Sequence, residues 1–310
     1  MLGPIAIALA IYLAWSIGGN DVANSMGTVY GTRALSLKKA LILAAGLEFL
    51  GAVFLSGPVT ETIGKGIVPS LDIVAILCIM AVSALWLTIA SFKRMPISCT
   101  QAVIGALIGY GLVSAVGMNF APLGVMGLSW LITPFVALGL AGGLYYFLSR
   151  FLTKTIKTIK DKERIHKFYV YVQIVSAGLL CLAHGANDGG LAIGIMYNAF
   201  PNLIVLGAIS GGAMALGILT IGKRVVKMIG RGITFLTPLS GCIAQATAGT
   251  LILALSIAGI PVSTTHIVLG ALVGVGLKRI KWANLRKVML FSFATIPVTA
   301  ALMILLKTVI

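Results

Sequence analysis

The stretch PISCTQAVIGALIGYG at residues 96–111 returns as PVSTTHIVLGALVGVG at residues 261–276, 165 positions later. Two shorter matches keep the same order at nearly the same offset: GGND at 18–21 with GAND at 185–188, and TIGKGI at 62–67 with MIGRGI at 228–233. Three ordered matches at one offset are not expected from composition alone. The sequence therefore predicts a duplicated chain.

The composition excludes a soluble globular protein. Of the 310 residues, 59% are hydrophobic and 10% charged, and the mean hydropathy is +1.08. A membrane-crossing helix needs about 20 apolar residues. Ten apolar segments of about this length are expected: 2–30, 36–57, 71–92, 97–118, 122–149, 168–190, 201–222, 232–258, 261–277 and 287–309. We predict an all-α polytopic membrane protein.

The ten segments fall into two halves, 1–149 and 168–310, joined by a basic linker at 150–167. The linker is either a basic amphipathic helix on anionic lipid or a solvated tether. Five crossings per half is an odd number, so the two repeats have inverted topology, as in many secondary transporters. If 71–118 is a re-entrant hairpin, the parity does not change.

Basic residues are distributed unequally between the connections. With both termini outside, 21 Lys and Arg residues fall on the cytoplasmic side, and only Lys65 and Lys307 fall opposite. This is the positive-inside bias. We predict a plasma-membrane protein with extracytoplasmic termini, an outside 58–70 connection and a retained first span in place of a signal peptide.

The four cysteines, Cys78, Cys99, Cys181 and Cys242, lie in or beside apolar stretches and have no paired spacing. They are interpreted as small core residues and not as disulfides or metal ligands.

Asp21 and Asp188 each lie inside an apolar run and follow Asn20 and Asn187. A carboxylate at that depth costs at least about 2.5–3.5 kcal/mol on insertion scales. Paired Asn-Asp motifs on unwound backbone suit a monovalent cation or a proton. The structural alternative is an aspartate that caps a broken helix.

Each long repeat has the form Pro-hydrophobic-Ser-X-Thr-polar before a Gly-spaced helix. Hydroxyl, amide and imidazole groups at a helix start form an anion cradle, and two facing cradles could hold one tetrahedral oxyanion. The alternative is that the hydroxyls only cap the helices. The cradle residues are Ser98, Thr100 and Gln101 in the first half, and Ser263, Thr264, Thr265 and His266 in the second. For Gly105, Gly109, Gly270 and Gly274 we expect close helix packing.

Glu48 lies inside the second apolar run and has no carboxylate counterpart in the other half. It is a third cation ligand, a proton site or a partner in an interhelical hydrogen bond. His184 precedes Asn187 by three positions and so shares its helix face. The accessory candidates for the binding site are Glu48, His184, His266 and Arg94.

At these residues the chain resembles the inorganic phosphate transporter (PiT) family. The resemblance rests on NDVANSMGT at 20–28, HGAND at 184–188 and the two Pro segments at 96–101 and 261–266. It implies a secondary transporter, not an enzyme, that carries phosphate with sodium or protons and is similar to dimeric relatives.

In the family picture, Asp21 and Asp188 serve cation and phosphate binding, with Asn20, Asn24 and Asn187 completing a sodium site. The Ser and Thr residues of the Pro segments then hold the phosphate. Two positions depart from the family pattern: Leu191 stands opposite Asn24, and Gln101 stands where His is common.

Competing functions remain open from the sequence. A sulfate permease of the same fold is the nearest, because some relatives carry sulfate. An anion channel is less favoured, because two inverted halves around one site suit alternating access. An intramembrane hydrolase with an Asp21–Asp188 acid/base pair lacks a nucleophile motif.

Overall fold

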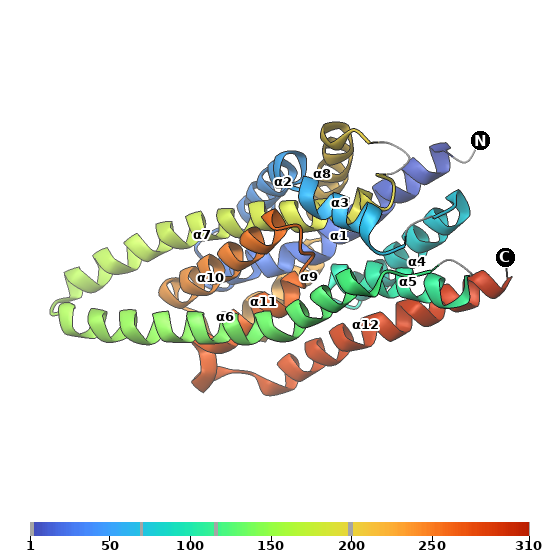
Figure 1. Cartoon of the computed structure of the whole chain (residues 1–310). Helices are drawn as coiled ribbons and strands as arrows, with labels where there is room; N and C mark the ends of the chain where they lie inside the picture. The colour runs from blue at the N-terminus through green and yellow to red at the C-terminus, as the bar shows by residue number, and fades with distance from the viewer. Residues whose placement is uncertain (1–2, 69–70, 115–116, 198–200, 310) are drawn as a thin grey trace.

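The computed structural model describes the whole chain except residues 1–2, 69–70, 115–116, 198–200 and 310. The described chain is a bundle of α-helices (Figure 1). The first six are α1 (Gly3–Gly31), α2 (Leu37–Leu55), α3 (Gly57–Gly66), α4 (Ile73–Phe92), α5 (Cys99–Val113) and α6 (Phe120–Thr155). The other six are α7 (Ile159–Gly194), α8 (Leu203–Thr220), α9 (Lys223–Gly232), α10 (Pro238–Ile257), α11 (Thr264–Gly276) and α12 (Trp282–Val309).

Seven of the described helices are long and apolar enough to cross a membrane, and the bent pair of α2 and α3 is an eighth candidate. The expectation of an all-α polytopic membrane protein is confirmed.

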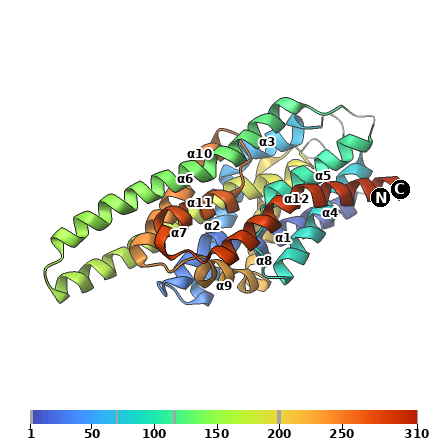
Figure 2. The same cartoon turned by 90° about the horizontal axis from the view of Figure 1, so that it is seen from below.

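The two sets of six helices follow one plan. Helices α1 and α7 run in opposite directions, and so do α6 and α12 (Figures 1 and 2). The start of α1 and the end of α12 lie at one end of the bundle, called the terminal end below, and the α6–α7 connection lies at the other, called the linker end. This arrangement agrees with inverted repeats.

Two short helices were not expected from the sequence. The sequence predicts a connection at 58–70, but the stretch contains α3, which departs from the axis of α2 by 64°. Its second-half counterpart is α9. The apolar segment after α9 was expected to start at 232, but the helix found there, α10, begins with Pro238. Proline fits the first turn of a helix, and it takes that place in both α3 and α10. The mixed Gly and Lys composition of α3 conceals it from a hydropathy reading.

The structure shows 71–118 as a hairpin of α4 and α5. Helix α4 has 20 residues, about 30 Å at 1.5 Å per residue, which is enough to cross the hydrocarbon layer. The shorter α5 returns toward the start of α4, and the amide of Asn119 donates to the carbonyl of Ile67 at 2.9 Å. Two crossings and a re-entrant hairpin both have this form, so the two alternatives stay predictions.

The second half contains the matching hairpin of α10 and α11. The amide of Lys281 donates to the carbonyl of Ile233 at 2.8 Å, which closes this hairpin at its open end. The two hairpins therefore match each other in this closing hydrogen bond as well as in sequence.

The repeats interlock through exchanged helices. Helix α5 of the first half packs against α12, and α11 of the second half packs against α6. A Cβ atom on Gly109 would collide with the carbonyl of Ala300, and one on Gly270 with the carbonyl of Pro134. The expectation that the spaced glycines allow close helix packing is confirmed.

The charged stretch at 150–167 is largely helical. Helix α6 continues to Thr155, and α7 begins at Ile159 after a capping box between Thr158 and Asp161. The 36 residues of α6 span about 54 Å, so its last turns extend beyond a hydrocarbon layer of about 30 Å. The division of the chain at 149 and 168 stays a prediction.

Candidate functional site

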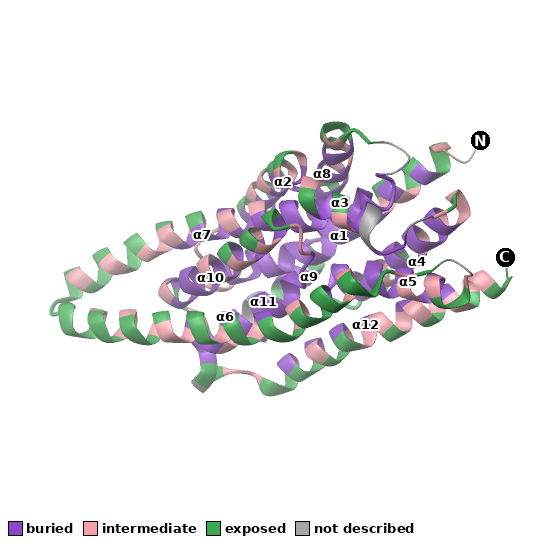
Figure 3. Cartoon of the chain, viewed as in Figure 1, coloured by how far each residue is buried: buried purple, intermediate pink, exposed green. Residues whose placement is uncertain are grey.

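The two Asn-Asp motifs lie in the middle of the buried core. Asn20 and Asp21 on α1 and Asn187 and Asp188 on α7 are each 0% exposed. Burial is concentrated in this central part of the bundle, while α6 is largely exposed (Figure 3). Polar groups at such a place need partners within the protein.

Asn20 fixes the segment that connects α4 to α5. Its side-chain oxygen accepts the amide of Ile97 at 2.9 Å, and its Nδ2 donates to Ser91 Oγ at 2.9 Å and to the carbonyl of Met95 at 3.1 Å. The backbone groups of this extended segment lack the partners that they would have in a helix, and the Asn20 side chain supplies them.

Asn187 does the same for the segment that connects α10 to α11. Its oxygen accepts the amide of Val262 at 3.0 Å, and its Nδ2 donates to the carbonyl of Val262 at 3.1 Å and to Asp188 Oδ1 at 2.7 Å. Both asparagines, expected as cation ligands, therefore have their oxygens engaged by a backbone amide.

The two connecting segments are tied to each other by threonines. The Thr100 hydroxyl donates to the carbonyl of Val262 at 2.6 Å, and the Thr265 hydroxyl donates to the carbonyl of Ile97 at 3.0 Å. Each repeat thus supplies a hydroxyl to the extended segment of the other. These four residues are called the threonine interlock below.

Asp21 joins the first repeat to the second. Its Oδ2 accepts the Thr264 hydroxyl at 3.0 Å and its Oδ1 accepts Asn24 Nδ2 at 2.8 Å. Asn24 Nδ2 also donates to Thr265 Oγ1 at 2.9 Å. The Asn24 oxygen is buried and accepts no hydrogen bond within the described part of the chain. It is therefore available to a bound cation.

Asp188 has one open oxygen. Its Oδ2 is buried and has no hydrogen-bond partner among the described residues, and the carboxyl group of Asp21 lies close to it. Two carboxyl groups at such a place repel each other unless a cation or a proton lies between them. The structure thus brings together the two aspartates that the sequence singled out.

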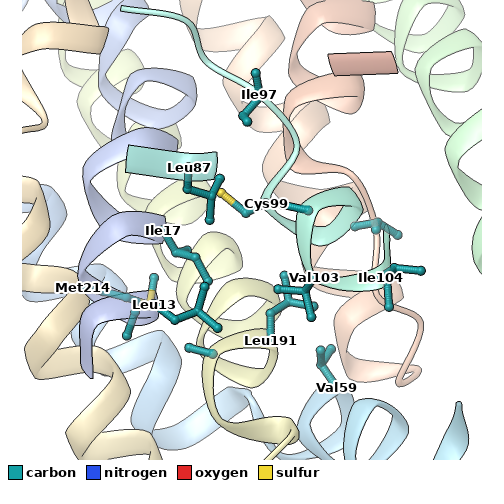
Figure 4. Packing of buried hydrophobic residues seen from close by; sticks show 14 of the residues in the cluster. Leu13, Ile17, Val59, Leu87, Ile97, Cys99, Val103, Ile104, Leu191 and Met214 are labelled. Atoms are coloured by element: carbon teal, nitrogen blue, oxygen red, sulfur yellow. The ribbon is translucent and has the colours of Figure 1, made fainter. Parts of the chain in front are cut away.

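The expectation that the cysteines are small core residues is confirmed. All four are free and buried. Cys99, opposite Thr264 in the repeat, is 1% exposed and belongs to the hydrophobic cluster in which Figure 4 labels it.

A second polar cluster adjoins the centre toward α2 and α7. Glu48 Oε1 accepts the Ser25 hydroxyl at 3.2 Å and lies 3.7 Å from His184 Nδ1. Gln245 on α10 donates to the backbone carbonyl of Ser25 at 2.7 Å. Glu48 Oε2 has no hydrogen-bond partner in the described chain. Ser25 and Gln245 were not expected, because single polar residues carry no repeat signal.

The remaining cradle residues have two different positions. Ser98 and Ser263 accept the amides of Gln101 and His266 at 3.2 and 3.3 Å, so both serines cap their helices. Gln101 and His266 meet at Ser292 of α12, with contacts of 3.4 and 3.0 Å. These two polar side chains border a cavity of about 540 Å³ between α6, α11 and α12.

Arg94 and Leu191 lie away from the bonded groups of the centre. Arg94 is exposed in the turn after α4, where its backbone has φ 60°. Leu191, which stands opposite Asn24 in the repeat, belongs to a hydrophobic cluster with Val103 and Val59 (Figure 4). The two repeats are therefore not equivalent in the polar groups that they supply.

The whole arrangement can hold ions that have lost their water. Carboxylate and amide oxygens suit a cation, and the hydroxyls and amides at the starts of α5 and α11 suit an oxyanion. The central aspartates and the interlock threonines are at most 1% exposed, so the centre is closed to solvent. Release of a bound ion requires the helices to move.

Comparisons with known proteins agree with this reading. Residues 17–303 match the model of a family described as the phosphate transporter family. A protein of Thermococcus kodakarensis named as a phosphate permease is 31% identical, over 96% of this chain and 94% of its own length. The chloroplastic inorganic phosphate transporter 2-1 of Arabidopsis thaliana is 28% identical, over 98% of this chain and 71% of its own.

The fold has a solved counterpart. The structure of a sodium-dependent phosphate transporter superposes with a TM-score of 0.87 over 100% of both chains, at 24% sequence identity. The Thermococcus alignment covers 386 positions, more than the 310 residues of this chain. That relative therefore contains segments that this chain lacks.

Proposed function

The chain belongs to the phosphate transporter family, and from this premise we propose that it imports inorganic phosphate by symport with a cation, sodium in preference to a proton, through alternating access. Membership makes the protein a multi-pass membrane transporter and not an enzyme. The hydrolase alternative is thereby removed.

One observation carries the proposal of coupled binding. Asp21, from the first repeat, accepts a hydroxyl from Thr264 at the helix start of the second repeat, in a centre with no exposed carboxylate. A cation between Asp21 and Asp188 would relieve their repulsion and leave the helix-start donors for an anion. Anion affinity would then depend on cation occupancy.

The side-chain oxygen of Asn24 supports sodium over the proton as the coupling ion. An amide oxygen coordinates a cation but does not titrate, and this one accepts no bond in the described part of the chain. The sodium-dependent transporter with the same fold supports the same choice. Sodium is thus proposed as a substrate held by Asp21, Asp188 and Asn24.

This assignment differs from the family picture at two residues. Asn20 and Asn187 have both atoms of their amides bonded within the protein. We assign them the positioning of the connecting segments.

Phosphate is proposed over sulfate because of its protons. At neutral pH phosphate still carries hydrogen and can donate to a carboxylate, whereas sulfate only accepts. The open oxygen of Asp188 supplies such an acceptor.

The threonine interlock supports alternating access. Its two bonds join the repeats at the centre, and the Thr62 hydroxyl donates to the carbonyl of Gly259 at 2.7 Å to join them again near α3. Opening toward either end requires one set of contacts to break, as expected for two repeats that rock around a fixed site. A plasma-membrane location and a homodimer complete the proposal.

Uptake into proteoliposomes tests the proposal. Labelled phosphate and labelled sulfate are supplied with either a sodium gradient or a pH gradient. We expect phosphate to accumulate against its own gradient only with sodium. A preference for sulfate would show that sulfate is the substrate, and dependence on the pH gradient alone would show that the proton is the coupling ion. Equilibration of phosphate without accumulation would indicate a channel.

A further inference from the structure

A polar cavity opens at the linker end, separate from the central site. It has a volume of about 350 Å³ and lies where the last turns of α6 meet the start of α10 and the end of α11. Its polar lining comes from Tyr145, Tyr146 and Ser149 of α6, Thr237 and Ser240 beside α10, and Arg279 after α11. Gly142 of α6 and Gly274 of α11 line the cavity where the two backbones approach each other closely.

We place the cavity at the depth of lipid headgroups from the length of α6. Counted from Phe120, 20 residues span about 30 Å and reach residue 139, so Tyr145 and Tyr146 lie beyond the length that a crossing needs. Tyrosines are typical of this interface, since the ring lies among chains and the hydroxyl among headgroups. The neighbouring Leu144 and Phe147 are exposed on the apolar surface of the same helix.

Positively charged side chains lie at and beside the cavity. Arg279 lines it and is exposed. Arg150 donates to the hydroxyl of the lining residue Tyr146 at 2.5 Å. Lys281 lies over the ring of Phe235, a further lining residue, at 4.8 Å. Within the described part of the chain, neither Arg150 nor Arg279 forms an ion pair.

The start of α10 is not itself the anion site. Thr237 and Ser240 form a reciprocal capping box there, which already satisfies a first-turn amide. Recognition must instead come from the guanidinium of Arg279 and the hydroxyls of α6. A guanidinium matches phosphate oxygens in geometry and charge.

We propose that this cavity binds the phosphodiester headgroup of an anionic phospholipid, with Arg279 on the phosphate and the acyl chains along the exposed face of α6. Basic pockets between membrane helices at the cytoplasmic face are known to hold such headgroups. The lipid joins α6 to α11, and α11 begins at Thr264, which bonds Asp21. Its occupancy stabilises the arrangement that closes the central site.

The test compares lipids on the purified protein. Thermal unfolding is followed during titration with dihexanoyl phosphatidylglycerol, with dihexanoyl phosphatidylcholine and with inorganic phosphate. The variants are Arg279→Gln, Ser149→Trp, which fills the cavity and keeps the arginine, and Arg286→Gln. The last is a matched control, because Arg286 is exposed on α12 and does not line the cavity.

We expect phosphatidylglycerol to raise the unfolding temperature of the unmodified chain and of Arg286→Gln equally. Arg279→Gln should weaken its apparent affinity roughly five-fold, the effect of one basic residue at an anionic surface, and Ser149→Trp should abolish the effect. Equal losses of affinity in both arginine variants would mean that general surface charge explains the effect, and this would overturn the proposal. An equal response to phosphatidylcholine, or an Arg279-dependent response to inorganic phosphate, would also overturn it.

Discussion

The side-chain oxygen of Asn20 accepts the backbone amide of Ile97 at 2.9 Å, across 77 residues of sequence. The bond between Asn187 and Val262, at 3.0 Å, is its counterpart in the second repeat. In each repeat, the asparagine of the Asn-Asp motif positions a connecting segment and the aspartate faces the centre. In the proposed function, the asparagine of each motif thus has a structural role and the aspartate binds ions.

Asn20→Leu is expected to destabilise the protein, because it leaves the amide of Ile97 and the carbonyl of Met95 without partners. Each unpaired buried group costs about 1–3 kcal/mol. Asn20→Asp keeps an acceptor for Ile97 and should cost less at high proton concentration, where the carboxyl is neutral. Thermal unfolding in detergent measures both. An unchanged unfolding temperature in Asn20→Leu would return Asn20 to the candidates for cation binding.

Asp21→Asn and Asp188→Asn are expected to abolish sodium-coupled phosphate uptake in folded protein. An amide can still accept from Thr264 or Asn187, so the packing survives while the charge that attracts the cation is lost. Uptake into proteoliposomes and the unfolding temperature are measured together. Glu163→Gln, a loss of one exposed charge on α7, is the control and should transport normally. Normal sodium dependence in either central variant would make that aspartate structural.

The threonine interlock can be tested by a double-mutant cycle. Thr100→Val and Thr265→Val each keep the side-chain shape and remove one bond between the repeats, at a cost of about 0.5–1.5 kcal/mol. Because the two bonds join the same pair of segments, the double variant should depart from additivity.

Phosphate titration of the same variants separates two roles of these hydroxyls. Loss of affinity, roughly two-fold or more, is expected if they also bind the anion. Wild-type affinity with reduced stability would limit them to joining the repeats.

Two glycines of α2 offer a matched test of close packing. A Cβ atom on Gly51 would collide with the backbone carbonyl of Leu182, while one on Gly46 would meet no atom within 4 Å. Gly51→Ala should destabilise the protein by about 1–3 kcal/mol, and Gly46→Ala should be neutral or stabilise it by up to about 1 kcal/mol. Equal unfolding temperatures for the two variants would contradict the approach of α2 to α7.

The orientation in the membrane can be tested by labelling. In a background without the four native cysteines, Gly117→Cys lies at the terminal end and Lys157→Cys at the linker end. An impermeant thiol reagent added to intact cells should label position 117 alone. Labelling of 157 alone would invert the topology, and labelling of both would refute the inverted repeats.

The sequence was sufficient for the bundle and for the pairing of its halves. Hydropathy identifies a membrane-crossing helix because the bilayer requires a long run of apolar residues. The repeat identifies Asp21 and Asp188 because a charge inside an apolar run must have a function or a partner. Both signals are local or periodic.

The partners of these residues were not predictable. Nothing near Thr100 indicates that its hydroxyl reaches Val262 in the other half, since a contact of that kind depends on how helices pack. The bend before α3 was missed for the same reason. Similarly, Gln101 was expected at the anion site because it shares a motif with Thr100, but its own helix turns it toward Ser292.

The exchange of helices between the repeats has a consequence for biogenesis. Helix α5 is complete at Val113, but α12, against which it packs, begins only at Trp282. Until α12 has been synthesised, the glycine face of α5 lacks its neighbour. We therefore expect the two repeats to assemble only after most of this stretch has been inserted into the membrane, and a nascent chain cut short before residue 282 to be exposed to degradation.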